Sequence, residues 1–301
     1  MHHPIHRFEG IWLPLITPFR DGAVDLAAAR LLVDFYAGAG VHGLVICGTT
    51  GEAATLSADE KLRWLDAVLD AAAGRLPVAM GTGSSDTAAS VRALAPLNAR
   101  PLAGLLVTPP AYTRPSQAGI RAHLAAIAQA TPHAVMLYNI PYRTGVNIDL
   151  DTVQSLCELP NVAAIKESGG NLNQLMDLIA QTRLDVLAGE DHLIFTTLCL
   201  GGRGAIAAAA HLRPHWHVAV YEAVRRGDWL LARELSAQLL PLVRLLFEEP
   251  NPAPIKALLA QQGLIADELR LPMLPASRSM RAQLDRVLAA LPEQPPTVLR
   301  A

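Results

Sequence analysis

Lys166 is the residue of this sequence that is best placed for covalent chemistry. It ends the apolar run 162–166 (VAAIK) and is followed by Glu167 and Ser168, so its amine lies where a buried strand should meet a loop. An ammonium group among apolar neighbours loses hydration, and this favours the neutral amine that can attack a carbonyl carbon. A lysine that ends a strand and reaches for water fits this run equally well. The neighbouring segments must therefore decide between these interpretations.

Two other loops carry groups that bind anions or move protons. In GTTGE at 48–52, Thr49 and Thr50 lie between two glycines, and exposed N–H groups there could hold a carboxylate or a phosphate. Tyr138 ends another apolar run, and its phenol can donate or accept a proton. Five residues later Arg143 offers a planar guanidinium to a carboxylate. Taken singly, a tight turn, a packed tyrosine and a solvated arginine explain these residues better.

Two more segments complete the set of candidate groups. The segment TPPAYTRP at 108–115 is framed by prolines and presents Tyr112 to solvent or to a neighbouring subunit, unless it serves only as a hydrophobic lid. Gly189 follows an apolar run and permits close approach of the backbone to a ligand, although a turn explains it equally well. No GxGxxG follows a predicted strand, and the sequence contains no GxSxG and no cation cluster for a phosphorylated substrate. A lysine, phenols, hydroxyls and one arginine predict imine chemistry on an unphosphorylated keto acid, with Lys166 as nucleophile.

Short apolar runs alternate with segments of helical spacing along most of the chain. Apolar residues recur three or four apart in these intervening segments, as at Leu62, Leu65 and Leu69. Eight runs are continuous enough to be buried strands: 11–16, 43–46, 77–80, 104–107, 134–138, 162–166, 186–188 and 204–207. Strands that are apolar throughout indicate a parallel sheet covered by helices, and eight such units close naturally into a barrel. The sequence therefore predicts an α/β fold, a (β/α)8 TIM barrel, with an open doubly wound sheet as the alternative.

The last third of the chain has a different pattern. After residue 211 the sequence predicts helices alone, over residues 214–226, 229–247, 254–262 and 277–291. Helix starts carry capping residues, with Ser57 and Glu60 at capping-box spacing and Ser116 and Asp228 before other helical runs. We therefore expect a barrel over residues 1–211 and a C-terminal helical region over 212–301 packed on it.

Composition and charge exclude several classes of protein. The chain has 301 residues, of which 51% are hydrophobic and 17% charged, and its formal net charge is -2 at pH 7 with a pI near 6.5. No long run of lysine or arginine occurs, so neither nucleic acid nor an anionic membrane surface is an expected partner. The start of the sequence lacks an apolar stretch of signal-peptide length, and no run is long enough to span a bilayer.

Cysteine and histidine usage narrows the chemistry further. Cys47, Cys157 and Cys199 are odd in number and lie among apolar residues, which is typical of reduced thiols in a cytoplasmic protein. HExxH and CxxC motifs are absent, and His215 and His217 would point to different faces of a helix. The sequence therefore predicts no metal and no cofactor.

At this point several spaced motifs, in order, resemble those of the dihydrodipicolinate synthase and N-acetylneuraminate lyase family. The motifs span nearly the whole chain: GTTGE at 48–52, TPPAYTRPSQ at 108–117, YNIPYRTG at 138–145, IKES at 165–168, and EPNPAPIK with LRLPM near the C-terminus. The resemblance implies that Lys166 forms a Schiff base with pyruvate and that Tyr138 shuttles protons. It also implies a proton relay of Thr49, Tyr138 and Tyr112, with Tyr112 contributed across a subunit contact.

The resemblance also assigns the substrate contacts. Thr50 and its loop backbone would hold the pyruvate carboxylate, and the carbonyl region of Ile206 would complete that pocket. Gly189 is a further candidate for substrate binding, and Arg143 would bind the carboxylate of the second substrate. A homotetramer built from tight dimers is the expected assembly.

Two features of the motifs bear on the identity of the second substrate. GTTGE and the arginine of the RTG segment resemble the synthase branch, in which pyruvate condenses with L-aspartate-4-semialdehyde to give 4-hydroxy-tetrahydrodipicolinate, a precursor of lysine and diaminopimelate. Tyr142 is bulky where synthases often carry a small residue, so the pocket for the aldehyde could be reshaped. The alternatives are an N-acetylneuraminate lyase-like or keto-sugar-acid aldolase or dehydratase, and a non-catalytic barrel that binds a keto acid.

Overall fold

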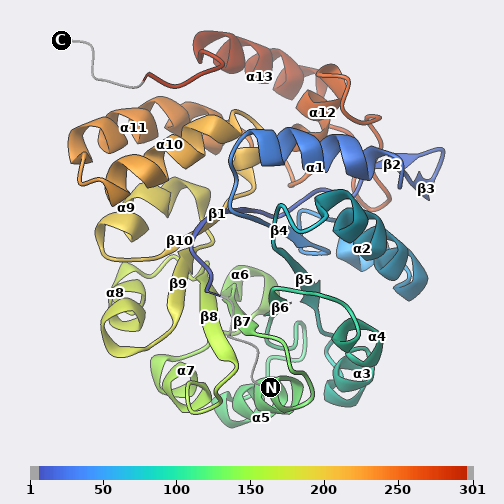
Figure 1. Cartoon of the computed structure of the whole chain (residues 1–301), viewed down its shortest axis with the longest axis vertical. Coiled ribbons are helices and arrows are strands. Elements are labelled where there is room, and N and C mark those ends of the chain that lie inside the picture. The colour runs from blue at the N-terminus through green and yellow to red at the C-terminus, as the bar shows by residue number, and fades with distance from the viewer. Residues whose placement is uncertain (1–6, 297–301) are drawn as a thin grey trace. The chain divides into compact units, whose positions relative to one another are not determined.

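The strand order of the protein is that of a closed eight-stranded barrel (Figure 1). This computed structural model describes residues 7–296, so the first six residues, on which the expectation about targeting signals partly rests, lie outside it. The barrel strands are β1 Gly10–Leu13, β4 Gly43–Ile46, β5 Val78–Thr82, β6 Gly104–Val107, β7 Val135–Asn139, β8 Val162–Glu167, β9 Asp185–Ala188 and β10 Gly204–Ile206. Each strand overlaps one of the eight apolar runs, so the predicted barrel is confirmed.

Tertiary contacts group the chain into two compact units. The first unit contains residues 7–9 and Val78–Ile206, and thus strands β5 to β10. The second contains Gly10–Pro77 and the residues from Ala207 onward, and thus β1, β4 and the C-terminal helices. The predicted division at residue 211 stays a prediction.

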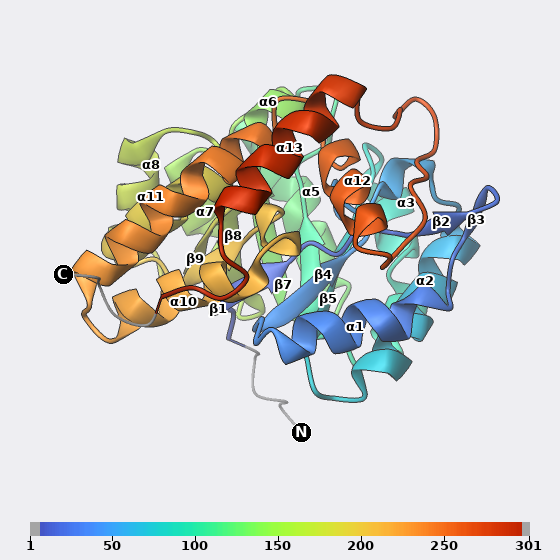
Figure 2. The ribbon, with the colours of Figure 1, turned by 90° about the horizontal axis from the view of Figure 1, so that it is seen from above.

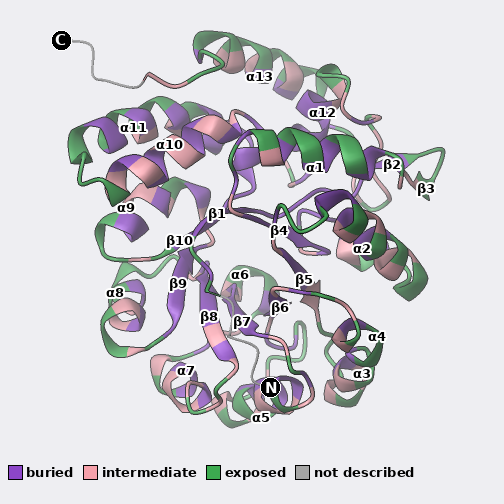
Figure 3. Ribbon diagram, in the orientation of Figure 1, coloured by how far each residue is buried: buried purple, intermediate pink, exposed green. Residues whose placement is uncertain are grey.

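In the first unit, consecutive strands pair in parallel and their residues are almost all buried. The pairing places Leu105 opposite Val135 and Ala164 opposite Asp185. The helices of this unit are α3 Thr87–Arg92, α4 Ala95–Asn98, α5 Gln117–Gln129, α6 Pro141–Thr144, α7 Leu150–Leu156, α8 Leu172–Gln181 and α9 Ile194–Cys199. Figure 3 shows buried strands and exposed outer faces on α5 and α8, as expected when helices cover a parallel sheet.

One glycine shows how tightly the base of this sheet is packed. A Cβ atom on Gly104 would lie 2.7 Å from the carbonyl oxygen of Ala134 and 2.6 Å from the ring of Phe8. Only glycine fits at the first residue of β6. Phe8 is in turn held by its N–H, which donates to the buried Asp185 carboxylate at 3.0 Å.

The second unit combines two barrel strands with six long or medium helices. Its helices are α1 Ala28–Gly38, α2 Ala58–Ala72, α10 Pro214–Arg225, α11 Trp229–Leu245, α12 Ala253–Gln261 and α13 Arg278–Ala290. The four predicted C-terminal helices are confirmed, with ends that differ by one or two residues. Helix α13 packs along α11 and α12 (Figure 2). A short hairpin of β2 Phe19–Arg20 and β3 Ala23–Val24 was not expected from the sequence.

The predicted helix starts are also confirmed. The Ser57 hydroxyl accepts the Glu60 N–H at 3.2 Å, and the Glu60 carboxylate accepts the Ser57 N–H at 2.9 Å, which completes a capping box. Ser116 and Asp228 cap α5 and α11 through single bonds to backbone N–H groups. Over the described part of the chain, no helix has both the length and the apolar character to cross a bilayer.

Candidate active site

Lys166 and Tyr138 lie side by side at the ends of neighbouring strands. The two residues are partners in the register of β8 and β7. The Nζ atom of Lys166 is 4.1 Å from the centroid of the Tyr138 ring, and the residues are only 7% and 6% exposed. The structure therefore brings together the predicted nucleophile and the predicted proton carrier.

The amine of Lys166 has an aromatic neighbour but no counterion among the residues that the structure describes. Among residues 7–296, no carboxylate lies within ion-pair distance of its Nζ atom, and no hydrogen bond holds it. Gly189 provides room beside the lysine, because a Cβ atom there would lie 2.9 Å from Lys166 Cγ and would overlap the hydroxyl of Ser168. A buried amine without a carboxylate partner is suited to attack on a carbonyl carbon.

Gly189 and Ile206 lie at the same edge of their strands. Ala188 is paired with Ala205 in the register of β9 and β10, so the next residue of each strand, Gly189 and Ile206, follows at the same level. Ile206 is 1% exposed. Both residues are thus placed where the sequence predicted them, at the carboxyl ends of barrel strands.

A second polar pair, Asn139 and Glu167, follows directly in the register of β7 and β8. The amide of Asn139 donates to both carboxylate oxygens of Glu167, at 3.0 and 3.1 Å, and the N–H of Gly169 donates to one of them at 2.5 Å. Burial raises the pKa of Glu167, and these hydrogen bonds oppose the rise. Because side chains alternate along a strand, this pair faces away from Lys166 and Tyr138.

The Asn139 and Glu167 pair anchors the loop that carries Arg143. Asn139 Oδ1 accepts the N–H of Ile148 at 3.0 Å, and Asn139 Nδ2 donates to Asn147 Oδ1 at 2.8 Å. Gln174 of α8 donates to the carbonyl oxygen of Ile148 at 3.2 Å. The far end of the loop is therefore fixed by one buried and two half-buried amide groups that the sequence motifs did not reveal.

Arg143 and Tyr142 are both exposed on the short helix α6. The guanidinium carbon of Arg143 lies 5.5 Å from the centroid of the Tyr142 ring. Desolvation, reinforced by Glu190 and Tyr138, raises the pKa of Tyr142 to about 12, although Arg143 acts in the opposite direction. The bulky residue noted in the sequence thus shares an electrostatic environment with Tyr138 and Arg143.

Tyr112 points away from the body of its own chain. It is 94% exposed, and its φ of 71° lies in the left-handed region that non-glycine residues rarely adopt. The loop is held on either side, since Ser85 Oγ donates to the Ala111 carbonyl at 2.8 Å and a Cβ on Gly145 would lie 2.7 Å from Arg114 Nε. The structure presents Tyr112 outward as predicted, and its part in a proton relay stays a prediction.

Thr49 and Thr50 belong to the second unit, in the loop after β4. Thr50 is 4% exposed, whereas Thr49 is exposed. The amide of Asn251 donates to the Thr50 hydroxyl oxygen at 2.9 Å. The loop is also fixed at Gly51, whose carbonyl oxygen accepts the Thr17 hydroxyl at 2.7 Å. The buried threonine is therefore rigidly placed.

Glu52, the last residue of this loop, forms an ion pair that the sequence did not reveal. It pairs with Lys256, and the two side chains are 2% and 0% exposed. Lys256 also donates to the carbonyl oxygen of Glu268 at 3.0 Å, and its Nζ lies 4.1 Å from the centroid of the Phe19 ring. Burial lowers the pKa of Lys256, and Glu52 opposes this effect. One feature of the sequence could have drawn attention to Lys256, because the chain has only three lysines, at 61, 166 and 256.

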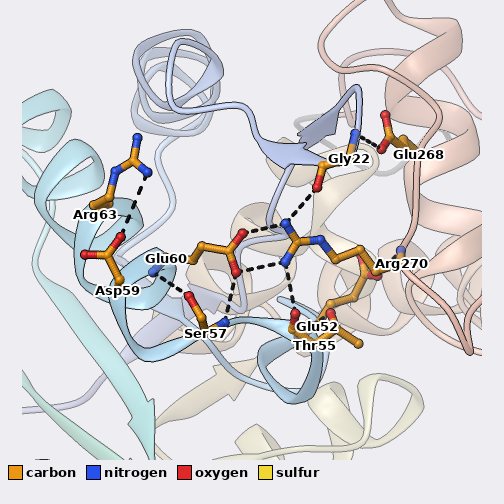
Figure 4. Close-up of polar contacts among 9 residues, drawn as sticks. All are labelled: Gly22, Glu52, Thr55, Ser57, Asp59, Glu60, Arg63, Glu268 and Arg270. Carbon is orange, nitrogen blue, oxygen red and sulfur yellow. Dashed lines mark hydrogen bonds and ion pairs between the residues drawn. The ribbon is translucent and has the colours of Figure 1, made fainter.

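Arg270 extends the same cluster outward (Figure 4). Its guanidinium donates to both carboxylate oxygens of Glu60, at 2.5 and 2.9 Å, and to the carbonyl oxygens of Thr55 and Gly22 at 3.0 and 2.8 Å. Arg270, with the Ser57 N–H, lowers the pKa of Glu60 to about 2. The N-terminus of α2 is thereby tied to the chain near residue 270.

Comparison with known proteins identifies the family. A model of the "Dihydrodipicolinate synthetase family" matches residues 7–291. The chain belongs to this family. A protein named "4-hydroxy-tetrahydrodipicolinate synthase 2" from Clostridium acetobutylicum is 40% identical over 285 residues, which cover 94% of this chain and 100% of the relative. A "4-hydroxy-tetrahydrodipicolinate synthase" from Syntrophobacter fumaroxidans is 41% identical over 286 residues, with coverage of 94% and 98%.

Solved structures of the family have the same fold. A dihydrodipicolinate synthase from Acinetobacter baumannii, described as chloride inhibited and complexed with pyruvate, superposes with a TM-score of 0.90 at 32% identity. The superposition covers 93% of this chain and 98% of that one. The family predicted from the motifs is thus confirmed over nearly the whole chain.

Proposed function

We propose that this protein is a lyase that condenses pyruvate with L-aspartate-4-semialdehyde to 4-hydroxy-tetrahydrodipicolinate through a Schiff base on Lys166. The observation that carries the proposal is the buried Lys166 amine, which has no counterion in the described part of the chain and lies 4.1 Å from the centroid of the Tyr138 ring. The relatives that cover almost all of this chain bear the name of this activity. This reaction supplies the pathway to lysine and diaminopimelate.

Lys166 and Tyr138 carry the covalent steps. The amine attacks C2 of pyruvate, and loss of water gives the imine. Loss of a methyl proton then gives an enamine, whose carbon attacks the aldehyde and forms the new carbon–carbon bond. The amino group of the second substrate next attacks C2 and displaces Lys166 as the ring closes. Tyr138 moves protons between these steps, because a phenol both donates and accepts.

The remaining candidates bind and orient the substrates. Thr50 and its loop would hold the pyruvate carboxylate, Gly189 and Ile206 would also bind substrate, and Arg143 would hold the carboxylate of the aldehyde. Thr49 and Tyr112 complete the proposed relay with Tyr138. Tyr112 is 94% exposed in the single chain, which supports its contribution to a neighbouring subunit.

The proposal also includes an assembly and a cellular location. A homotetramer made of tight dimers would let each Tyr112 serve the site of a partner. Light scattering of the purified protein measures the assembly, and a monomeric active enzyme would contradict the shared relay. A cytoplasmic location is proposed from the cysteine usage.

Borohydride trapping tests the covalent step directly. With pyruvate present, reduction should add one pyruvyl group per chain, and peptide mass mapping should place it on Lys166. Only Lys61 and Lys256 compete for the label in a chain with three lysines. The Lys166→Met variant is the control and should acquire no label. Absence of label on the wild-type protein would overturn the imine mechanism.

A substrate panel separates this function from its alternatives. Condensation of pyruvate with aspartate semialdehyde should be fast, and cleavage of sialic and sugar acids should be absent. Arg143→Ala should raise the KM for the aldehyde more than that for pyruvate. Efficient cleavage of sugar acids, with aldehyde use unaffected in Arg143→Ala, would favour the lyase alternative. Pyruvate binding without turnover of any aldehyde would favour a keto-acid sensor.

A further inference from the structure

In the second unit, the segment 251–256 contacts the GTTGE loop at two points. Asn251 Nδ2 donates to the Thr50 hydroxyl oxygen at 2.9 Å, and the Lys256 ammonium pairs with the Glu52 carboxylate. These two loop residues flank Gly51, which the Thr17 hydroxyl holds through its carbonyl oxygen at 2.7 Å. The loop that was predicted to bind a carboxylate is therefore positioned from the C-terminal part of the chain.

The Asn251 contact determines what the Thr50 hydroxyl can do. A hydroxyl has one hydrogen to donate and two lone pairs that accept. Because Asn251 donates to the Thr50 oxygen, the Thr50 hydrogen stays available for another acceptor. Thr50 is thereby prepared as a donor, and a donor is what a carboxylate requires.

The Lys256 contact fixes the backbone of the same loop. Glu52 has a φ of 50°, in the left-handed region, and its N–H donates to the Thr49 carbonyl oxygen at 3.0 Å. Its side chain also accepts the N–H of Arg270 at 3.3 Å. A buried carboxylate without a cation would have to move toward water or take up a proton, and either change would release the loop.

We propose that Asn251 and Lys256 are positioning residues for the pyruvate carboxylate, acting through Thr50 and Glu52. The C-terminal segment 251–256 then holds the pyruvate-binding loop in position. This inference rests on the proposed function, because it takes pyruvate as the ligand of the loop. Neither residue touches the reacting atoms in the proposal, so their loss weakens pyruvate binding more than it slows chemistry.

Substitutions of Asn251 test the donor role of Thr50. Asn251→Ala should raise the KM for pyruvate about fivefold to tenfold, with little change in kcat. Asn251→Asp should raise it further, because the Thr50 hydroxyl would donate to the new carboxylate and the added charge would repel pyruvate. The exposed Asn173 on α8 supplies a matched control, and Asn173→Asp should leave both constants unchanged. A structural role would make Asp no worse than Ala, which would overturn the proposal for Asn251.

The ion pair is tested with a variant that avoids a stranded buried charge. Lys256→Met combined with Glu52→Gln leaves neutral groups of similar size, so the double variant should fold. Its KM for pyruvate should rise at least about tenfold, while pyruvate should still become trapped on Lys166 at saturating concentration. Lys61→Met removes an ammonium that forms no ion pair within residues 7–296, and it should leave the KM unchanged.

The outcomes distinguish this inference from the proposed function. If the wild-type protein traps no pyruvate on borohydride reduction, the function itself is wrong. If the wild type traps pyruvate and the Asn251 and Lys256 variants keep its KM, the positioning role is wrong. Circular dichroism and thermal unfolding of each variant confirm that a raised KM belongs to a folded protein.

Discussion

Lys166 and Lys256 occupy superficially similar places in the two units of the molecule. Both are buried, with 7% and 0% exposure, and the amine of each lies 4.1 Å from the centroid of an aromatic ring. They differ in their polar partners. Lys256 pairs with Glu52 and donates to a backbone carbonyl, whereas Lys166 has neither kind of partner among residues 7–296. Burial and an aromatic neighbour therefore do not by themselves mark a reactive lysine.

The carboxylate is what separates the two roles. The Lys256 nitrogen is held by the Glu52 carboxylate and the Glu268 carbonyl oxygen, so Lys256 can position a loop but cannot approach a carbonyl carbon. The Lys166 nitrogen has no such partner among residues 7–296, so no ion pair must be broken before it attacks. The same side chain thus stabilises one region and performs chemistry in the other.

Lys166→Met should produce the largest effect and should affect activity alone. We expect turnover to fall by at least about 10³-fold, because no other side chain replaces the nucleophile. The melting temperature should stay the same or rise, since methionine replaces a buried amine that has no ion pair or hydrogen bond within the described chain. Steady-state kinetics and thermal unfolding measure the two quantities. A folded variant that retained activity would remove Lys166 from the mechanism.

Lys256→Met should lower the stability of the protein as well as weaken pyruvate binding. Removing one partner of a buried ion pair leaves Glu52 without its cation, which lowers the free energy of unfolding by about 3–5 kcal/mol. Denaturant unfolding measures this change, and Glu52→Gln added to Lys256→Met should recover part of it. A variant as stable as the wild type would show that the ion pair contributes only position and no stability.

Much of the fold could be predicted from the sequence because one physical signal repeats. Each buried strand is a short apolar run, as in GLLV at 104–107, and the following helix begins at a recognisable cap such as Ser57 or Ser116. The hairpin at residues 19–24 escaped prediction because its strands have two residues each, too few for any periodicity.

The sequence revealed site residues only where a reactive side chain lies at or just after the end of a strand. Lys166 and Tyr138 were found because each directly ends an apolar run. Lys256 was missed because it lies inside an apolar helix, and its partner Glu52 is some two hundred residues earlier in the chain. Such a pairing depends on tertiary structure, and no local pattern specifies it. The Asn139 and Glu167 network was hidden for the same reason.

Glu167→Gln should produce a smaller and more selective change. The Glu167 carboxylate only accepts hydrogen bonds, and its donors lie on Asn139, Gly169 and Gln174. The glutamine amide would turn its own N–H groups toward some of these donors, and those hydrogen bonds would be lost. The loop that carries Arg143 should loosen, and the KM for the aldehyde should rise several-fold. Trapping of pyruvate on Lys166 should be unchanged. Equal loss of pyruvate trapping would show that Glu167 acts on Lys166 itself.

The ion pair of Glu60 and Arg270 is partly exposed, with side chains 23% and 20% accessible, and its loss should give the smallest effect. Arg270 and the Ser57 N–H lower the pKa of Glu60 from its usual 4.5 to about 2. Because the folded pKa is the lower one, the stabilisation is present above about pH 4.5 and is lost as the pH falls toward 2. We expect only about 1 kcal/mol, since solvent screens this pair.

Urea unfolding at pH 5.5 and pH 3 measures the Glu60 contribution by difference, with Glu60→Gln as the matched variant. The variant's stability deficit should shrink as the pH falls, because below about pH 4.5 Glu60 takes up a proton in the unfolded wild-type protein before it does so in the folded one. Lys256→Met should show the larger deficit at pH 5.5, since the pair of Lys256 with Glu52 is buried, whereas water reaches Glu60 and Arg270. If the two deficits were equal at that pH, the buried pair would be no stronger than the partly exposed one, and solvent exclusion would not explain how the GTTGE loop is held.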